Sequence, residues 1–186
     1  GDPVAIATGS DGQVLTSTGA GSPPAFEAAA GGSGGLEEAD IWRITTECTQ
    51  NCDPVVNWER ADGTGVGLVG TGMTQSSGIF TFPERGIWSV DFHLQGDYGE
   101  ASAVPVTGTI YITTDNSSYS IAAQKVQGVG GTSHRWNMSM LTFFDVLDVA
   151  NYKVKFVYAS TSPYGNLHGG TDYNKTCVAF LKLGDT

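Results

Sequence analysis

Residue types that bind metals or transfer protons at neutral pH are few and widely spaced in this chain of 186 residues. Of the three histidines, only His93 has a carboxylate beside it on a predicted strand, at Asp91. Residues two apart on a strand share a face, so this pair could form part of a metal site. His134 and His168 fall in glycine-rich loops. Polar surface or interface groups are therefore the simpler interpretation, and we predict no metal site.

The three cysteines leave one question open. Cys48 and Cys52 lie four apart in "CTQNC", a spacing compatible with a small disulfide-closed loop or half of a metal site. A zinc site needs four ligands in recognisable pairs, and the sequence favours two free thiols in a loop, with a disulfide as the alternative. Cys177 stands in the apolar run "TCVAFLKLG" and is expected to pack as a small hydrophobe.

Sequence motifs of catalysis are either absent or in the wrong context. The stretch "GGSGG" at 31–35 matches a nucleophile elbow in letters, but that motif needs a strand before it and a helix after it. The stretch "GVGGTS" at 128–133 lacks the βαβ unit of a dinucleotide site. Acidic residues are scattered, with no indication of a cleft between a catalytic pair. We predict no catalytic residues, no cofactor and no enzymatic activity.

Two loops are richer in recognition chemistry. Residues 95–105 and 160–174 combine tyrosine with Gly, Ser and Asn, the composition of adaptable binding loops. We expect them to face a host surface glycan or protein, the alternative being ordinary glycine-rich connections. The candidate receptor-facing residues are Tyr98, Tyr164, His168 and Tyr173.

Length, composition and charge limit the number of domains and the classes of binding partner. The length suits one domain with an appendage, and 40% of the residues are apolar, enough for a core. A net charge of −10 repels phosphate backbones, so nucleic-acid binding is not expected. No apolar run reaches about 18 residues, so no membrane insertion is predicted, and no signal peptide is recognised.

From Asp40 onward, short apolar runs separated by Gly, Pro, Asn and Asp predict an all-β fold. In 86–94, Trp88 and Phe92 alternate with polar residues as in a half-buried strand. The segments 107–114 and 119–126 read as a hairpin around the turn at 115–118. The fold class is therefore an antiparallel sandwich or barrel.

Two predicted strands, at 136–146 and 177–184, are apolar on both faces. One face can meet the partner sheet, and the other needs a second cover. We expect a neighbouring subunit to supply it, the alternative being the arm or a long loop. The candidate subunit-interface residues are Leu141, Phe143, Val178 and Phe180.

The segment "SSGIFTFPERGIWSVDFHL", residues 76–94, and the closing "TCVAFLKLG" resemble the jelly-roll superfamily that includes tumour necrosis factor and the globular head of complement's collagen-like recognition protein. The resemblance covers residues 40–184. It implies a jelly-roll sandwich of about ten strands that forms tight homotrimers. Some members bind calcium at the trimer top, near the place of Asp97 and Glu100, but the match is not residue by residue and no metal is predicted.

The N-terminal stretch "GQVLTSTGAGSPPAFE", Gly12 to Glu27, is similar to a short repeat in tail-fibre and other virion surface proteins of tailed bacteriophages. That resemblance implies an extended arm and glycine-rich joint over 1–36, which attaches the knob at 37–186 to other virion proteins. Val14, Leu15 and Phe26 are its candidate anchoring residues. A disordered tail without a partner is the alternative.

Together these features predict a phage virion structural protein: the trimeric knob of a tail fibre or host-attachment appendage. A capsid decoration protein, either a head fibre or a cement protein, is the alternative, in which the arm grips the shell. A secreted lectin-like or signalling module of the superfamily is a third possibility. The two virion hypotheses differ in what the arm contacts, which the sequence does not encode.

Overall fold

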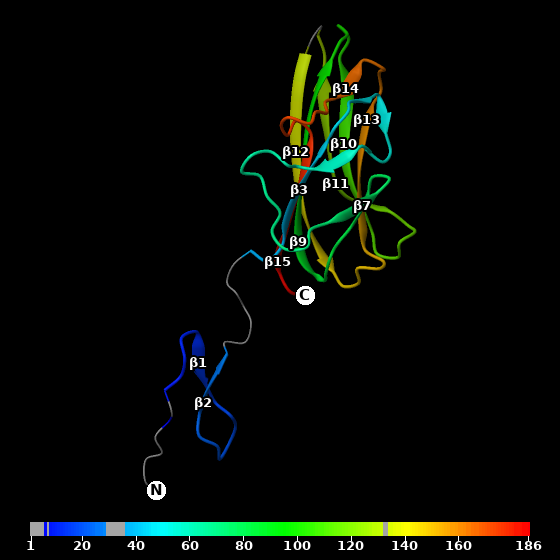
Figure 1. Ribbon diagram of the computed structural model, residues 1–186. Helices are drawn as coiled ribbons and strands as arrows, with labels where there is room; N and C mark the ends of the chain where they lie inside the picture. Colours follow the sequence, from blue (N-terminus) through cyan, green and yellow to red (C-terminus); the bar gives the residue numbers. More distant parts are fainter. Residues whose placement is uncertain (1–5, 7, 29–35, 132–133) are drawn as a thin grey trace. The chain divides into compact units, whose positions relative to one another are not determined.

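The computed structural model of the chain describes residues 6, 8–28, 36–131 and 134–186, where all regular secondary structure is β (Figure 1). The chain divides into two compact units, Gly1–Gly35 and Leu36–Thr186. The boundary lies one residue before the one expected from the sequence. The second unit is the knob, an antiparallel β-sandwich, as predicted.

The N-terminal unit contains a two-stranded hairpin. The chain therefore folds back on itself here and does not form the single extended arm that was expected. Strand β1 (Gln13–Thr16) pairs antiparallel with β2 (Ala25–Ala28), which brings Leu15 opposite Phe26. The turn between them uses Gly19 and Gly21 at positive φ, a conformation that glycine adopts without strain. The predicted joint at 28–35 lies, beyond Ala28, outside the described residues.

The first sheet of the knob has the order β12–β9–β15–β3–β6, with every neighbouring pair antiparallel. Short strands β14 and β4 extend this sheet beside the end of β9. The bounds are β3 (Ala39–Ile44), β4 (Cys48–Thr49), β6 (Trp58–Arg60), β9 (Gly86–Tyr98), β12 (His134–Val146), β14 (Gly165–Leu167) and β15 (Cys177–Gly184).

The second sheet has the order β11–β10–β13–β8–β7, and β5 pairs with β13 beyond β8. The predicted hairpin at 107–126 is its β10–β11 pair. Its strands are β5 (Asn51–Cys52), β7 (Thr74–Ser76), β8 (Ile79–Thr81), β10 (Val104–Thr113), β11 (Ser120–Val129) and β13 (Lys153–Ser160). The two sheets form the two layers seen in Figure 1.

The core fills the space between the sheets with aromatic side chains from both. Phe92 of the first sheet lies 4.7 Å from Phe156 of the second, centroid to centroid, and Phe80 lies 5.2 Å from Phe180. Trp58 packs edge-on to Phe80 at 5.5 Å. Such tilted and edge-to-face pairs add to the free energy gained from burial alone.

The long connection at 61–73 is fastened to the sandwich by two buried carboxylates. Glu38 accepts hydrogen bonds from the backbone N–H groups of Thr71 and Gly72, at 2.7 and 2.8 Å. Asp40 accepts one from Met73 N at 2.8 Å and two from the Arg60 guanidinium. These bonds compensate the cost of burying charge and hold the connection against β3.

Candidate functional site

The outward face of the β12–β9–β15–β3 sheet carries unusually large apolar side chains. On β12, the inward residues Trp136, Met138, Met140 and Phe144 are buried, as the alternation predicted. The outward Leu141 and Phe143 stay exposed, at 54% and 58%. The structure therefore places these two predicted interface residues on a free sheet face.

The prediction for β15 was wrong about which face points outward. Val178 and Phe180 are fully buried between the sheets, opposite Phe92 and Val90 of β9. Both faces of β15 are apolar in sequence, and the larger Phe180 fills the aromatic core. The outward residues are Cys177, Ala179, Leu181 and Leu183, of which Leu183 is 57% exposed.

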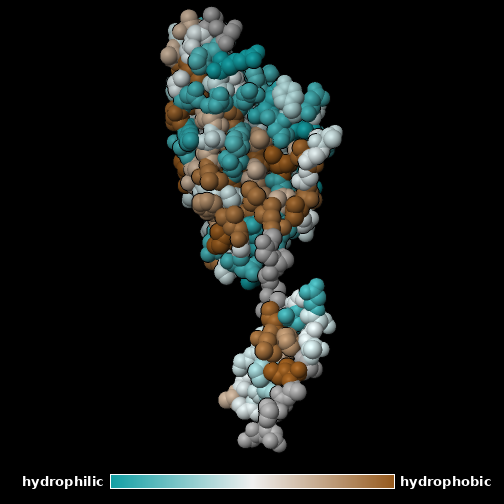
Figure 2. All heavy atoms as spheres, turned by 90° about the vertical axis from the view of Figure 1, so that its left-hand side faces the viewer, coloured by the Kyte–Doolittle hydropathy of each residue, from teal (hydrophilic) through white to brown (hydrophobic). Residues whose placement is uncertain are grey.

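Strand register assembles the outward residues into an apolar band. Phe143 and Leu181 lie on either side of Ser89, and Leu141 and Ala179 lie on either side of Asp91. Figure 2 looks onto this side of the knob and shows hydrophobic atoms gathered over its middle and lower part. The apolar residues therefore lie on β12 and β15, with the polar Ser89 and Asp91 of β9 between them, at the end of the sheet where β9 begins.

The connection at 61–73 adds exposed aliphatic residues beside β3, which were not predicted from the sequence. Val69 pairs with Ala39 through backbone hydrogen bonds of 2.9 and 3.1 Å, beside β3. Val66, Leu68 and Val69 are each about 40% exposed. The only sequence signal was a glycine-spaced run of aliphatic residues, which reads equally well as an ordinary loop.

The polar part of the same face brings together Asp91, His93 and Cys177. His93 Nε2 lies 3.0 Å from Asp91 Oδ2, and Cys177 is opposite His93 on the neighbouring strand. Burial raises the pKa of the Cys177 thiol to about 11, whereas a cysteine nucleophile needs a lowered pKa. Within the described residues, no group of three or more His, Cys, Asp or Glu is placed to hold a metal ion.

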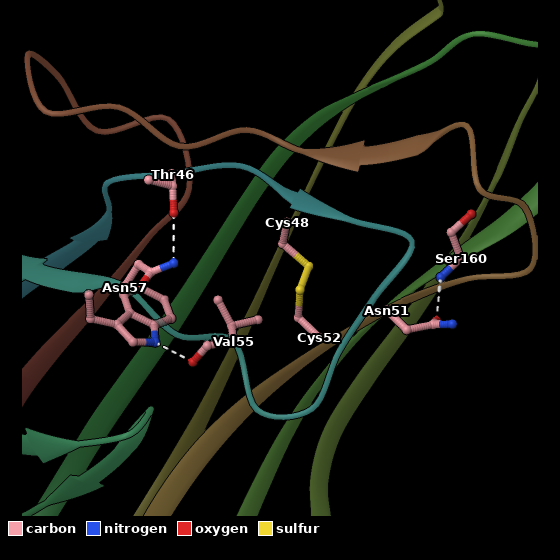
Figure 3. Close-up of a disulfide and its surroundings, with 8 residues drawn as sticks. Thr46, Cys48, Asn51, Cys52, Val55, Asn57 and Ser160 are labelled. Atoms are coloured by element: carbon pink, nitrogen blue, oxygen red, sulfur yellow. Dashed lines mark hydrogen bonds between the residues drawn. A yellow bond between two sulfur atoms is a disulfide. The ribbon is translucent and has the colours of Figure 1, made fainter.

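Cys48 and Cys52 form a disulfide (Figure 3), so the favoured interpretation of two free thiols was wrong. Cys48 belongs to β4 of the first sheet, and Cys52 to β5 of the second. The backbone N–H of Ser160 donates to Asn51 Oδ1 at 3.2 Å, which fixes the turn beside β13. The bridge therefore joins the two sheets at one edge of the sandwich.

The tyrosine-bearing loops divide into exposed and buried members. Tyr164 and Tyr173 are exposed, at 51% and 63%. Tyr98 is buried, contrary to its prediction as a receptor-facing side chain, because it is an inward residue at the end of β9. His168 is largely buried and lies 3.0 Å from Asp97.

In the arm, the three predicted anchoring residues are partly exposed on the hairpin. Val14, Leu15 and Phe26 are exposed at 44%, 52% and 37%. Leu15 and Phe26 are cross-strand partners, so they form one apolar pair. Among the described residues, no helix is long and apolar enough to span a bilayer.

Solved structures with a similar fold are known, although no sequence match was found. No protein-family model and no curated protein sequence matches the chain. Among solved structures, Eiger TNF from S. frugiperda is similar with a TM-score of 0.59 and 13% identity, over 80% of this chain and 93% of that one. Murine APRIL at pH 5.0 is similar with a TM-score of 0.57 and 10% identity, over 78% and 98%. The knob therefore has a TNF-like jelly-roll fold, as residues 76–94 and 176–184 indicated.

Proposed function

We propose that the chain is a non-enzymatic virion structural protein, the trimeric knob of a phage tail fibre or host-attachment appendage. The observation that carries the proposal is the apolar band on one outward sheet face. A large apolar patch on an otherwise well-packed domain marks an interaction surface. The N-terminal resemblance to virion surface proteins supplies the setting.

Two further copies of the chain are the proposed cover of the band. Leu141, Phe143 and Leu183 stay exposed although the sandwich beneath them is fully packed. The apolar residues of β12 and β15 lie on either side of Ser89 and Asp91 of β9, and apolar side chains of this kind form the core of a permanent interface. Trimerisation would also multiply weak single-site contacts into avidity at the loops.

The arm is proposed to attach the trimer to other virion proteins. An isolated two-stranded hairpin is marginally stable in water, and this one exposes the Leu15–Phe26 pair. Packing that pair on a partner surface would stabilise both the hairpin and the attachment. The same exposed pair favours the second candidate, a capsid decoration protein whose arm grips the shell.

A secreted lectin-like or signalling module is a weaker third candidate. The fold likeness to Eiger TNF and APRIL is compatible with it, and a disulfide persists best in an oxidising compartment. At 10 to 13% identity the likeness concerns fold alone. The arm resemblance favours a virion.

Two measurements test the proposal. Sedimentation equilibrium of the full chain should give three times the 19.5 kDa chain mass, and a monomer at micromolar concentration would refute the trimeric knob. Cryo-EM of the intact particle should then locate the chain. Density at the tip of a tail appendage supports the attachment function, density studding the shell supports decoration, and absence from the particle rejects both.

A further inference from the structure

A polar depression of about 400 Å³ lies at the end of the first sheet where β9 ends and β12 begins. The connection between β13 and β14 contributes Pro163 and Tyr164 to its rim, and Tyr98 lies beneath it. Asp97, Arg135 and Asn166 supply its polar groups. We propose that this depression binds a neutral saccharide, an inference that rests on the proposed attachment function and names the ligand class.

The polar groups are held in place before any ligand arrives. Asp97 Oδ2 lies 3.0 Å from His168 Nε2, and Asn166 Nδ2 donates to Asp97 Oδ1 at 3.2 Å. The Trp136 indole N–H donates to the Asp97 carbonyl oxygen at 3.2 Å, which fixes the backbone as well. A carboxylate and an amide oriented in this way can accept from and donate to neighbouring hydroxyl groups, at little further cost in side-chain entropy.

Arg135 adds a donor group that pairs with no side chain among the described residues. It is the cross-strand neighbour of Asp97, its side chain is exposed, and within the described part of the chain it forms no ion pair. A guanidinium carries five N–H donors in a planar fork. The depression therefore offers donors and acceptors side by side, as a ring with several hydroxyl groups requires.

Tyr164 provides the apolar complement. Its ring is half exposed at the rim, while its carbonyl oxygen accepts from Gly99 N at 3.3 Å and its N–H donates to Ser162 Oγ at 3.3 Å. The backbone is thus anchored and the ring is free to pack on the C–H face of a sugar. Aromatic rings provide large contact area at low entropic cost.

Charge decides against an anionic ligand. Asp97 lies within the depression, and Glu47 Oε1 is 4.0 Å from His168 Nε2. The Asp97 carboxylate inside the depression, the Glu47 carboxylate near His168 and a chain of net charge −10 disfavour phosphate, sulfate or an acidic sugar. A depression of this volume holds one or two pyranose rings, and its polar lining suits hydroxyl groups better than an apolar peptide anchor.

Its place in the knob also fits contact with a distant surface. The knob begins at Leu36, and Glu37 lies 3.3 Å from Lys182 near the start of β9. Strand β9 then runs 13 residues from Gly86 to Tyr98, about 40 Å at 3.3 Å per residue. The depression is thus at the opposite end of the sandwich from the arm junction, beside β14 in the upper part of Figure 1.

The test uses the fluorescently labelled full chain on a microarray of oligosaccharides. Neutral members contain glucose, galactose, mannose and N-acetylglucosamine, and acidic members contain uronic or sialic acids. Wild type should bind at least one neutral member. Tyr164→Ala and Asp97→Asn should each weaken that binding on the order of tenfold. Tyr173→Ala removes another exposed tyrosine, which lies outside the depression, and should change binding less than about twofold.

The outcomes separate the inference from the function on which it rests. No binding to any neutral member, binding confined to acidic members, or binding that Tyr164→Ala and Asp97→Asn leave unchanged overturns the saccharide site. Melting temperatures of the variants must match wild type, and Tyr164→Ala should meet this because its ring is exposed. If the same samples sediment as trimers without binding sugar, the inference fails and the trimeric knob stands. If they bind sugar as monomers, the trimeric knob fails and the saccharide site stands.

Discussion

On the outward face of the β10–β13 sheet, Lys155 reaches Asp53 at 2.6 Å and lies 5.3 Å from the ring centre of Tyr111 and 5.0 Å from that of Tyr119. On the outward face of the β9–β12 sheet, Leu141 and Phe143 have no such polar cover. Both sheets contribute alternating inward residues to one core. This difference in outward side chains is why the β9–β12 face, and not the face around Lys155, is the proposed interface.

The largest expected effect comes from placing a charge in the apolar band. Phe143→Asp should convert the proposed trimer to monomers and weaken association by at least about 100-fold, because three unpaired carboxylates would be buried in the interface. Sedimentation velocity measures this. Val126→Asp, at a 60% exposed position of β11, is the matched control and should remain trimeric. Dissociation of the control, or a trimeric Phe143→Asp, would abolish the distinction between the two faces.

A smaller effect, on the free energy of unfolding, is expected from replacing Lys182 near the C-terminal end of β15. The Lys182 ammonium lies 2.9 Å from Asp185, 3.0 Å from Glu84 and 3.3 Å from Glu37, with 5% of its side chain exposed. Hydrogen bonds to Asp185 and Glu84 raise the pKa of Lys182, so its contribution is present at neutral pH and is lost only when strong alkali deprotonates the ammonium.

Lys182→Met should therefore lower the free energy of unfolding by about 2 kcal/mol, less than for a fully buried pair, because the carboxylates remain hydrated. Urea unfolding at pH 7 measures the change. A loss below about 0.5 kcal/mol, within the range of ordinary surface substitutions, would mean that the three carboxylates do not hold this end of the sheet.

The matching substitution on the other sheet should cost less. Lys155→Met removes the ion pair with Asp53, whose side chain is 60% exposed, so the free energy of unfolding should fall by about 0.5 kcal/mol. The sedimentation coefficient should not change. A shift toward larger assemblies would show that the polar cover of this face is what keeps it unpartnered.

The smallest effect concerns the turn of the β10–β11 hairpin. Hydrogen bonds from Ser118 N, Thr113 Oγ1 and Ser117 N lower the pKa of Asp115 from 3.8 to about 2. A lowered folded-state pKa stabilises the fold above pH 3.8, and this contribution is lost as the pH falls toward 2. Asp115→Asn should therefore flatten the acid dependence of unfolding between pH 4 and 2. Parallel curves for variant and wild type would contradict this role.

Much of the fold was predictable because local patterns and the core agree. The alternation of Trp88, Val90, Phe92 and Leu94 could satisfy only a strand with one buried face, and these four residues are buried. The hairpin around 115–118 was equally predictable from the sequence, because Asp115 and the residues after it form a turn by local hydrogen bonds. The jelly-roll topology of the sandwich was predicted from the superfamily resemblance.

The candidate sites were less predictable because they depend on residues from separate strands. Nothing in the local sequence around Asp97, Arg135 or Tyr164 indicates that these three residues share one depression. The disulfide was likewise undecided by its spacing, since it depends on how β4 and β5 approach each other across the two sheets.

The sequence by itself determined the all-β class, the positions of strands β9 to β12 and β15, and the separation of arm from knob, since these follow from alternation and composition along short stretches. Only the tertiary structure decided which apolar face of β15 is the inside. Either Val178 and Phe180 or Ala179 and Leu181 could have faced the core. The space beside the core phenylalanines accommodates Phe180, which packs against Phe80 and Phe156. Packing volume is a property of all the strands at once, so no single strand can encode it.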